Sequence, residues 1–196
     1  VGVSLGIAGA LRRNSLTDYS AGIIGVAGIA VPIFVIAPLM QLFFAIRLGW
    51  LPVGGWNNGW QSLVLPVIAL SLPNIAYISR LTRSAMIETL RENYIRTARA
   101  KGIGGRRVVW RHAMIGALMP VIAYIGPATA AIITGSILIE TIFALPGIGR
   151  HFVDAALNRD YPLVMGITIV YGGFLILFNI LTDLLRGWLD PRVRHV

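Results

Sequence analysis

Long stretches without a charged residue divide this chain into apolar segments separated by polar loops. The first of them, residues 19–46, contains no charged side chain over 28 positions. As a straight α-helix it would be roughly 42 Å long, which exceeds the ~30 Å of hydrocarbon in a bilayer. The pattern therefore predicts a membrane span that is tilted, or kinked at Pro32 or Pro38.

Further apolar segments follow. The sequence GWLPVGGWNNGWQ is typical of a loop, so we expect the next helix to run only from Ser62 to about Met86. Charge-free runs over 113–139 and 161–182 predict two more spans. Residues 1–11 are apolar but too short to cross a bilayer, and we expect them to end a span that begins earlier in a longer chain. The predicted fold class is an all-α polytopic transmembrane bundle with four complete spans and the end of a fifth.

The composition supports a membrane protein and excludes several other classes. Of the 196 residues, 56% are hydrophobic and 13% are charged, against about 25% charged residues in a soluble domain. The chain has no cysteine, which excludes a disulfide framework, a cysteine zinc site, an iron–sulfur cluster and a cysteine nucleophile. The formal net charge of +9 would suggest nucleic acid in a soluble protein, but in a membrane protein it suggests topology.

The basic residues fall almost entirely on one side of the predicted spans. If successive spans alternate in direction, 14 of the 17 basic residues lie on the same side, which is therefore expected to be cytoplasmic. The C-terminus lies on that side too. The 14 residues are Arg12, Arg13, Arg80, Arg83, Arg91, Arg96, Arg99, Lys101, Arg106, Arg107, Arg111, Arg186, Arg192 and Arg194, and the other three are Arg47, Arg150 and Arg159.

The loop that follows the second predicted span is the most informative part of the sequence. Residues 80–111 hold nine basic residues and only two acids, Glu88 and Glu92. From Ile87 onward, apolar or small residues recur at intervals of three and four, which predicts a short amphipathic helix that ends at Gly102. One interpretation of this helix is a basic segment resting on anionic lipid headgroups. Another is a surface whose small residues, such as Ala98 and Ala100, allow a partner protein to approach closely.

The sequence YIRTARAKG at 94–102 resembles the coupling-loop signature of permease subunits of ABC importers, in the branch for dipeptides, oligopeptides and nickel. Arg96 departs from the wider superfamily, which has glutamate there. The blocks ETIFALPGIGR, NRDYPLV and DLLRGWLDPR also resemble that branch, in the same order along the chain. The resemblance assigns the ATPase-coupling role to Tyr94, Ile95, Arg96, Thr97, Ala98, Arg99, Ala100, Lys101 and Gly102. Gly102 has a simpler alternative role as a helix C-cap.

The resemblance implies a type I ABC importer permease fold, with 1–196 as one transmembrane permease domain and a cytoplasmic coupling loop at about 87–111. The implied partners are a second permease subunit, two cytoplasmic ATPase subunits that bind ATP and Mg²⁺, an external solute-binding protein and the lipid bilayer. No cofactor is expected in this chain, and no nucleic acid. The implied location is the cytoplasmic membrane of a bacterium or archaeon, and the substrate would be a peptide, nickel chelate, opine or glutathione.

Three polar residues of the spans are candidates for the translocation path: Glu140, Asn179 and Asp183. An interfacial role for Glu140 and helix-to-helix contacts for the other two are open alternatives. The sequence PGIG at 146–149 is typical of a turn.

No catalytic or metal-binding residue is predicted. The single lysine, Lys101, follows Ala100, so a Walker-type phosphate loop is absent, and the chain has neither H-E-x-x-H nor G-x-S-x-G. A channel or intramembrane enzyme whose basic loop serves only topology is the alternative class, and an assembly scaffold is a third.

Overall fold

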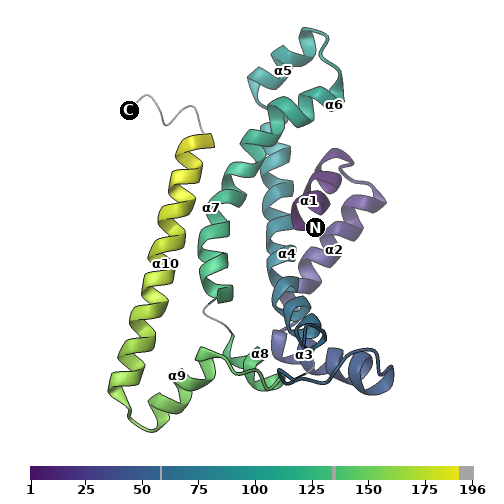
Figure 1. The fold of residues 1–196 in the computed structure, drawn as a ribbon. Helices are drawn as coiled ribbons and strands as arrows, with labels where there is room; N and C mark the ends of the chain where they lie inside the picture. Colours follow the sequence, from purple (N-terminus) through teal and green to yellow (C-terminus); the bar gives the residue numbers. More distant parts are fainter. Residues whose placement is uncertain (58, 134–135, 190–196) are drawn as a thin grey trace. The chain divides into compact units, whose positions relative to one another are not determined.

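The computed structural model describes residues 1–57, 59–133 and 136–189, apart from the side chains of 17, 21, 24, 26, 27 and 189. All regular elements in these ranges are helices (Figure 1). In chain order they are α1 (Gly2–Leu11), α2 (Leu16–Ala30), α3 (Ile33–Met40), the π-helix η1 (Gln41–Arg47), α4 (Gln61–Thr89), α5 (Asn93–Ala100), α6 (Gly105–Arg107), the π-helix η2 (Val108–Ala113), α7 (Met114–Ile133), α8 (Ile137–Ile142), α9 (Ile148–Leu157) and α10 (Tyr161–Leu189).

Three helical segments are long and apolar enough to cross a membrane. They are Gln61–Thr89, Tyr161–Trp188 and Gly105–Ile142, the last of which includes residues outside the described ranges. The all-helical class and the spans predicted from 62 and from 161 are therefore confirmed. The third predicted span, 113–139, is helical as far as Ile133, and Ile139 belongs to the separate helix α8.

The structure differs from the prediction over 19–46. This stretch is not one long helix, because α2 ends at Ala30 and α3 begins at Ile33, on the far side of Pro32. Pro32 has an extended backbone with φ −61° and ψ 142°. A proline has no N–H to donate and its ring clashes with the preceding turn, so the expected kink is a complete break. Pro38, by contrast, lies inside α3.

The packing of the chain divides into two compact units, each with its own apolar core. The first unit comprises 1–29, 74–126 and 180–196, and the second comprises 30–73 and 127–179. The prediction of a single permease domain over 1–196 remains a prediction.

In the first unit, glycines let α1 lie directly against α4. A Cβ atom at Gly2 would come within 2.8 Å of the carbonyl oxygen of Ile75, and one at Gly6 would lie 2.5 Å from that of Ser79. Small residues at helix contacts are the usual means of close packing in membranes, where dispersion forces replace the hydrophobic effect. Thr82 is fully buried there and donates its hydroxyl hydrogen to the Ile78 carbonyl at 2.7 Å.

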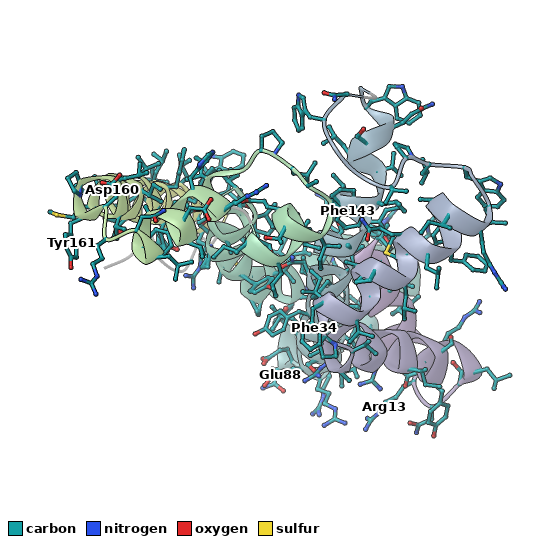
Figure 2. All side chains as sticks on the ribbon, turned by 90° about the horizontal axis from the view of Figure 1, so that it is seen from below. Arg13, Phe34, Glu88, Phe143, Asp160 and Tyr161 are labelled. Atoms are coloured by element: carbon teal, nitrogen blue, oxygen red, sulfur yellow. The ribbon has the colours of Figure 1, made fainter. Side chains whose placement is uncertain are left out.

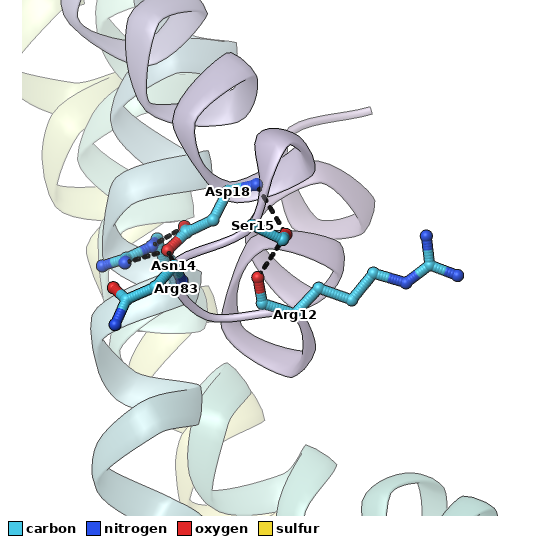
Figure 3. A network of polar contacts seen from close by, with 5 residues as sticks. All are labelled: Arg12, Asn14, Ser15, Asp18 and Arg83. Carbon is cyan, nitrogen blue, oxygen red and sulfur yellow. Dashed lines mark hydrogen bonds and ion pairs between the residues drawn. The ribbon is translucent and has the colours of Figure 1, made fainter.

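A buried ion pair joins the beginning of α2 to α4 in the same unit (Figure 3). Asp18 is 6% exposed, and its two carboxylate oxygens accept from Nε and an Nη of Arg83 at 2.5 and 2.7 Å. The Asn14 backbone N–H donates to the same carboxylate at 2.9 Å, and Ser15 accepts from the Asp18 N–H. These bonds from Arg83 and Asn14 lower the pKa of Asp18 to about 2, although burial opposes the shift.

The second unit packs around Phe143, which is fully buried (Figure 2). Its core consists of Ala37, Met40, Ala45, Leu65, Ala69, Ile139 and Phe143. The loop before α4 is fastened to this core by polar contacts. The Gln41 amide donates to the carbonyls of Val53 and Ile142 at 2.7 and 2.9 Å, and the Gly55 N–H donates to that of Phe143 at 2.7 Å.

Replacing Gly6 by leucine tests the contact between α1 and α4. Because no side chain fits between Gly6 and Ser79, we expect Gly6→Leu to reduce the free energy of unfolding by about 2 kcal/mol, as overpacking does. The measurement is the thermal unfolding midpoint of the purified protein in detergent. Ala8→Leu on the exposed face of α1 is the matched control, and an equal effect of both variants would contradict this packing.

Candidate functional site: the basic loop between α4 and α7

The helix predicted from Ile87 to Gly102 is shorter in the structure, because residues 87–89 still belong to α4 and only α5 forms a separate helix, which is anchored on the first unit. After α4 ends at Thr89, the extended residue Glu92 (φ −62°, ψ 149°) precedes α5. Within α5, Ile95 is fully buried and Ala98 is 6% exposed. Both belong to a core cluster that contains Ile7, Ala10, Met86, Ile95, Ala98, Val108, Val109, Ala113 and Ala117. The helix is therefore held by its own chain and needs no partner to fix its orientation.

Seven of the nine signature residues are exposed. They are Tyr94, Arg96, Thr97, Arg99, Ala100, Lys101 and Gly102. The structure divides the two alanines that the sequence offered as a surface for close approach, because Ala98 faces the interior while Ala100 faces outward. Only Ala100 is available to a partner.

Gly102 ends α5 in the left-handed conformation, with φ +75°. The Gly102 N–H donates to the Arg99 carbonyl at 2.9 Å, and the Ile103 N–H donates to the Ala98 carbonyl at 3.3 Å. This pair of bonds is a Schellman motif, which satisfies the free carbonyls at a helix end. Nothing lies within 4 Å of a Cβ built at Gly102, so glycine is needed for its backbone and not for space. The C-cap role is thus present in the structure, and the coupling role remains a prediction.

The loop presents a strongly positive surface. Of its nine basic residues, Arg83 is paired with Asp18, and the other eight make no ion pair within the described residues. Beyond Gly102, an open groove of about 790 Å³ is lined by Gly104, Gly105, Arg106, Arg107 and Trp110. The element at 105–107 is only three residues long. The neighbouring Val108 and Val109 are buried and anchor this part of the loop.

Sequence reasoning missed a contact that supports the base of the loop. A Cβ at Gly116 would lie 3.1 Å from Thr89 Cγ2 and 3.3 Å from the Tyr94 hydroxyl oxygen, so the absence of a side chain there makes room for both residues. Thr89 is buried at the end of α4. The only signal in the sequence was a glycine in an otherwise apolar run.

Glu140 has a structural role that explains the block ETIFALPGIGR. The residue is 7% exposed, and its Oε2 accepts from the Arg150 N–H in the first turn of α9 at 2.9 Å. A carboxylate at this position compensates the positive end of the helix. Any Cβ at Gly147 would overlap the Glu140 carboxylate, and one at Gly149 would lie 3.0 Å from its Oε2. The predicted turn at 146–149 is wrong, because Gly147 has an extended backbone and α9 already begins at Ile148. The two glycines of the sequence make room for Glu140.

The other two path candidates lie on α10. Asn179 is half-buried, whereas Asp183 is exposed and 3.5 Å from an Nη of Arg186. A role of Glu140, Asn179 and Asp183 in translocation stays a prediction. Among the residues that the structure describes, no group of His, Asp or Glu side chains could hold a metal ion.

Together, the membrane-length helices and the anchored basic loop between two of them define a polytopic helical membrane protein. The chain belongs to the family of binding-protein-dependent transport system inner membrane components, whose sequence pattern matches residues 2–195.

Known relatives are similar over the whole chain. It is 52% identical over 196 residues to the oligopeptide transport system permease protein OppB of Salmonella typhimurium, covering 100% of this chain and 64% of that protein. The dipeptide transport system permease protein DppB of Bacillus subtilis is 46% identical over 193 residues, with 98% and 62% covered. DppB of Lactococcus lactis is 44% identical over 194 residues, with 99% and 64% covered. The chain thus spans a little under two thirds of the length of these relatives.

Removing the Glu140 side chain tests its role as a helix cap. Glu140→Ala takes away the acceptor at the start of α9, and we expect a loss on the order of 1–2 kcal/mol in local stability. Amide hydrogen exchange over 148–157 should therefore accelerate about tenfold. Asp154→Ala, an exposed acid on the same helix, is the control. Unchanged exchange combined with lost transport would instead indicate direct contact with the substrate.

Proposed function

We propose that this chain is the membrane-spanning permease subunit of an ATP-driven ABC importer, and that α5 couples it to a separate ATPase. The observation that carries the proposal is the two-sided construction of α5. Its buried side, Ile95 and Ala98, fixes the helix on the permease, and its exposed basic side is left free. Membership in a family of transport-system membrane components supports the same function.

The length of α4 places α5 outside the bilayer in this proposal. From Gln61 to Arg80 the helix rises roughly 28 Å, which is about the thickness of the hydrocarbon core. From Arg80 to Thr89 it rises roughly 14 Å more, which carries the loop beyond the lipid headgroups. α5 then stands in the cytoplasm at the end of a continuous helix. A displacement of α5 by a bound ATPase is transmitted along α4, because a helix is stiff and its end is fixed to the core.

The partners and cofactors follow from this function. Two cytoplasmic ATPase subunits bind ATP and Mg²⁺ and hydrolyse the ATP, so this chain needs no cofactor of its own. A second permease subunit completes the path, and an external solute-binding protein delivers the substrate. The location is the cytoplasmic membrane, with α5 and the C-terminus on the cytoplasmic side. Arg192 and Arg194, which contribute to this orientation, lie outside the described residues.

The proposed substrates are peptides or a related small solute. The relatives named above are oligopeptide and dipeptide permeases, which favours peptides over nickel chelates, opines or glutathione. Within the chain, Glu140, Asn179 and Asp183 remain the proposed path residues, although Glu140 acts first as the cap of α9.

A loop that serves only topology fits the structure less well. Retention of positive charge on one side of the membrane depends on charge alone and needs no folded element. Here the charges are carried by a helix with two buried anchors and a Schellman end. A folded helix with a fixed orientation is expected of a surface that another protein must recognise.

Substituting the two alanines of α5 separates coupling from folding. Ala100→Asp adds an acid to the exposed basic side, and we expect substrate-stimulated ATP hydrolysis by the reconstituted complex to fall about tenfold or more, equivalent to ~1.4 kcal/mol of lost interaction. The thermal unfolding midpoint should stay unchanged. Ala98→Asp buries a charge in the core, so it should lower that midpoint as well.

The control for the added charge is Ala156→Asp, on the exposed side of α9. It should leave both the coupling and the midpoint as they are in the unmodified complex. Full coupling in the Ala100→Asp complex would refute the role of α5.

A further inference from the structure

The loop between η1 and α4 exposes three tryptophans. We define the tryptophan loop as residues 48–57 and 59–60. Trp50, Trp56 and Trp60 are 68%, 60% and 72% exposed, and no charged residue occurs in the sequence from 48 to 79. Large apolar side chains that are exposed together on one segment mark a contact with a membrane or with another protein.

Each of the three tryptophans follows a glycine in the left-handed conformation. The angle φ is +63° at Gly49, +85° at Gly55 and +60° at Gly59. A Cβ at any of the three would meet nothing within 4 Å, so glycine is needed there for its backbone and not for space. The other left-handed glycine among the described residues is Gly102. A turn of this kind directly before a tryptophan is therefore a repeated feature of this loop.

The chain's own contacts hold the tryptophan loop in place. The Trp50 N–H donates to the Phe44 carbonyl at 3.0 Å, and the rings of these two residues lie 6.2 Å apart. Directly before Trp56, the Gly55 N–H donates to the carbonyl of the buried Phe143 at 2.7 Å. The exposed indoles are thus carried by a backbone that is fastened to the core of the second unit.

Both ends of the loop lie where apolar helices end. On one side, η1 ends at Arg47, which is the first charged residue after the apolar run and cannot lie in hydrocarbon without cost. On the other side, the Leu63 N–H donates to the Trp60 carbonyl at 3.1 Å, so Trp60 belongs to the first turn of the membrane-length helix α4. Arg47, the loop and this first turn all belong to the second unit. The loop is therefore expected at the level where the hydrocarbon begins.

The composition of the loop favours lipid over a protein partner. A reversible interface between proteins is only about as apolar as the rest of a protein surface, and charged groups orient the partner. The tryptophan loop offers three indoles and no charge. Tryptophan is enriched where the hydrocarbon meets water, because its ring is apolar and its Nε1–H donates a hydrogen bond to polar lipid groups.

We propose that the tryptophan loop is an interfacial anchor, whose indoles lie among the lipid headgroups of the leaflet at the opposite end of α4 from α5. Arg47 is exposed and makes no ion pair with any residue that the structure describes, so its guanidinium is available to the lipid phosphates. The anchor holds the end of η1 and the beginning of α4 at one depth in the membrane. This proposal does not depend on the transport function.

The depth of the loop can be measured with a nitroxide label, because the 196 residues contain no cysteine. Val53→Cys and Asn57→Cys, at exposed positions between the tryptophans, are labelled one at a time. The full-length permease, with any other cysteine replaced by serine, is reconstituted with its partner subunits in lipid nanodiscs. Electron paramagnetic resonance then measures the collision rates of the label with oxygen, which concentrates in lipid, and with a nickel(II) chelate, which stays in water.

We expect the ratio of oxygen to nickel collisions at both positions to match that of phospholipids labelled near the top of the acyl chain. It should exceed several-fold the ratio at Asn158→Cys, an exposed position beside Arg159 and Asp160 that serves as the aqueous reference. A ratio equal to that at Asn158→Cys would place the loop in water, and exclusion of both reagents would show that a protein subunit covers it. Either result would overturn the proposal.

A second experiment tests whether the tryptophans hold the loop at this depth. Trp50→Ser, Trp56→Ser and Trp60→Ser are combined in the protein labelled at Asn57→Cys. Because the three side chains are exposed, the thermal unfolding midpoint in detergent should stay unchanged, while the collision ratio should fall several-fold, to the aqueous value. Trp110→Ser, which removes a tryptophan that is 61% exposed in the first unit, is the matched control and should leave the ratio unchanged. An unchanged ratio after loss of all three tryptophans would refute the anchor.

Discussion

The exclusion of charge from hydrocarbon is the constraint on which the rest of this structure depends. It leaves residues 61–79, 114–133 and 161–182 of the long helices without a charged side chain and moves the basic residues to the helix ends and the segments between them. Asp18, a buried carboxylate of the first unit, is bound by Arg83 and by a backbone N–H, because an unpaired charge there would be costly. Glu140 satisfies the same requirement in the second unit by accepting a hydrogen bond from the Arg150 N–H in the first turn of α9.

Much of this architecture can be predicted from the sequence, because charge-free runs indicate the membrane spans and basic loops indicate the segments outside the bilayer. The runs locate α4 and α10, and Pro32 is one of the two prolines at which the first long segment was expected to kink. The extent of that change could not be predicted, since a proline either kinks or breaks a helix depending on its neighbours. The role of Gly102 at the end of α5 was also open in the sequence, because a glycine there suits both a helix C-cap and a coupling surface.

Contacts between distant residues were beyond sequence reasoning. The intervals of three and four along the loop predict an apolar face, but the residues that this face meets, such as Met86 and Val108, lie outside α5 and could not be predicted. The partnership of Glu140 with Gly147 and Gly149 was hidden in a similar way. Its members are seven and nine positions apart, and the end of α8 at Ile142 and the loop that follows it bring them together in a way that the sequence does not show. The contact is visible only in the folded structure, where both glycines lie against the Glu140 carboxylate.

The construction of α5 also bears on how such a protein can change over time. Folding of the loop depends on Ile95, Ala98 and the backbone of Gly102, whereas the other side of the same eight-residue helix is exposed and is the surface proposed for recognition. Substitutions at Arg96, Arg99 or Ala100 therefore alter what the helix contacts without altering whether it forms. After a gene duplication, the two copies can acquire different partners through a few surface changes, while the membrane part remains under its own separate selection.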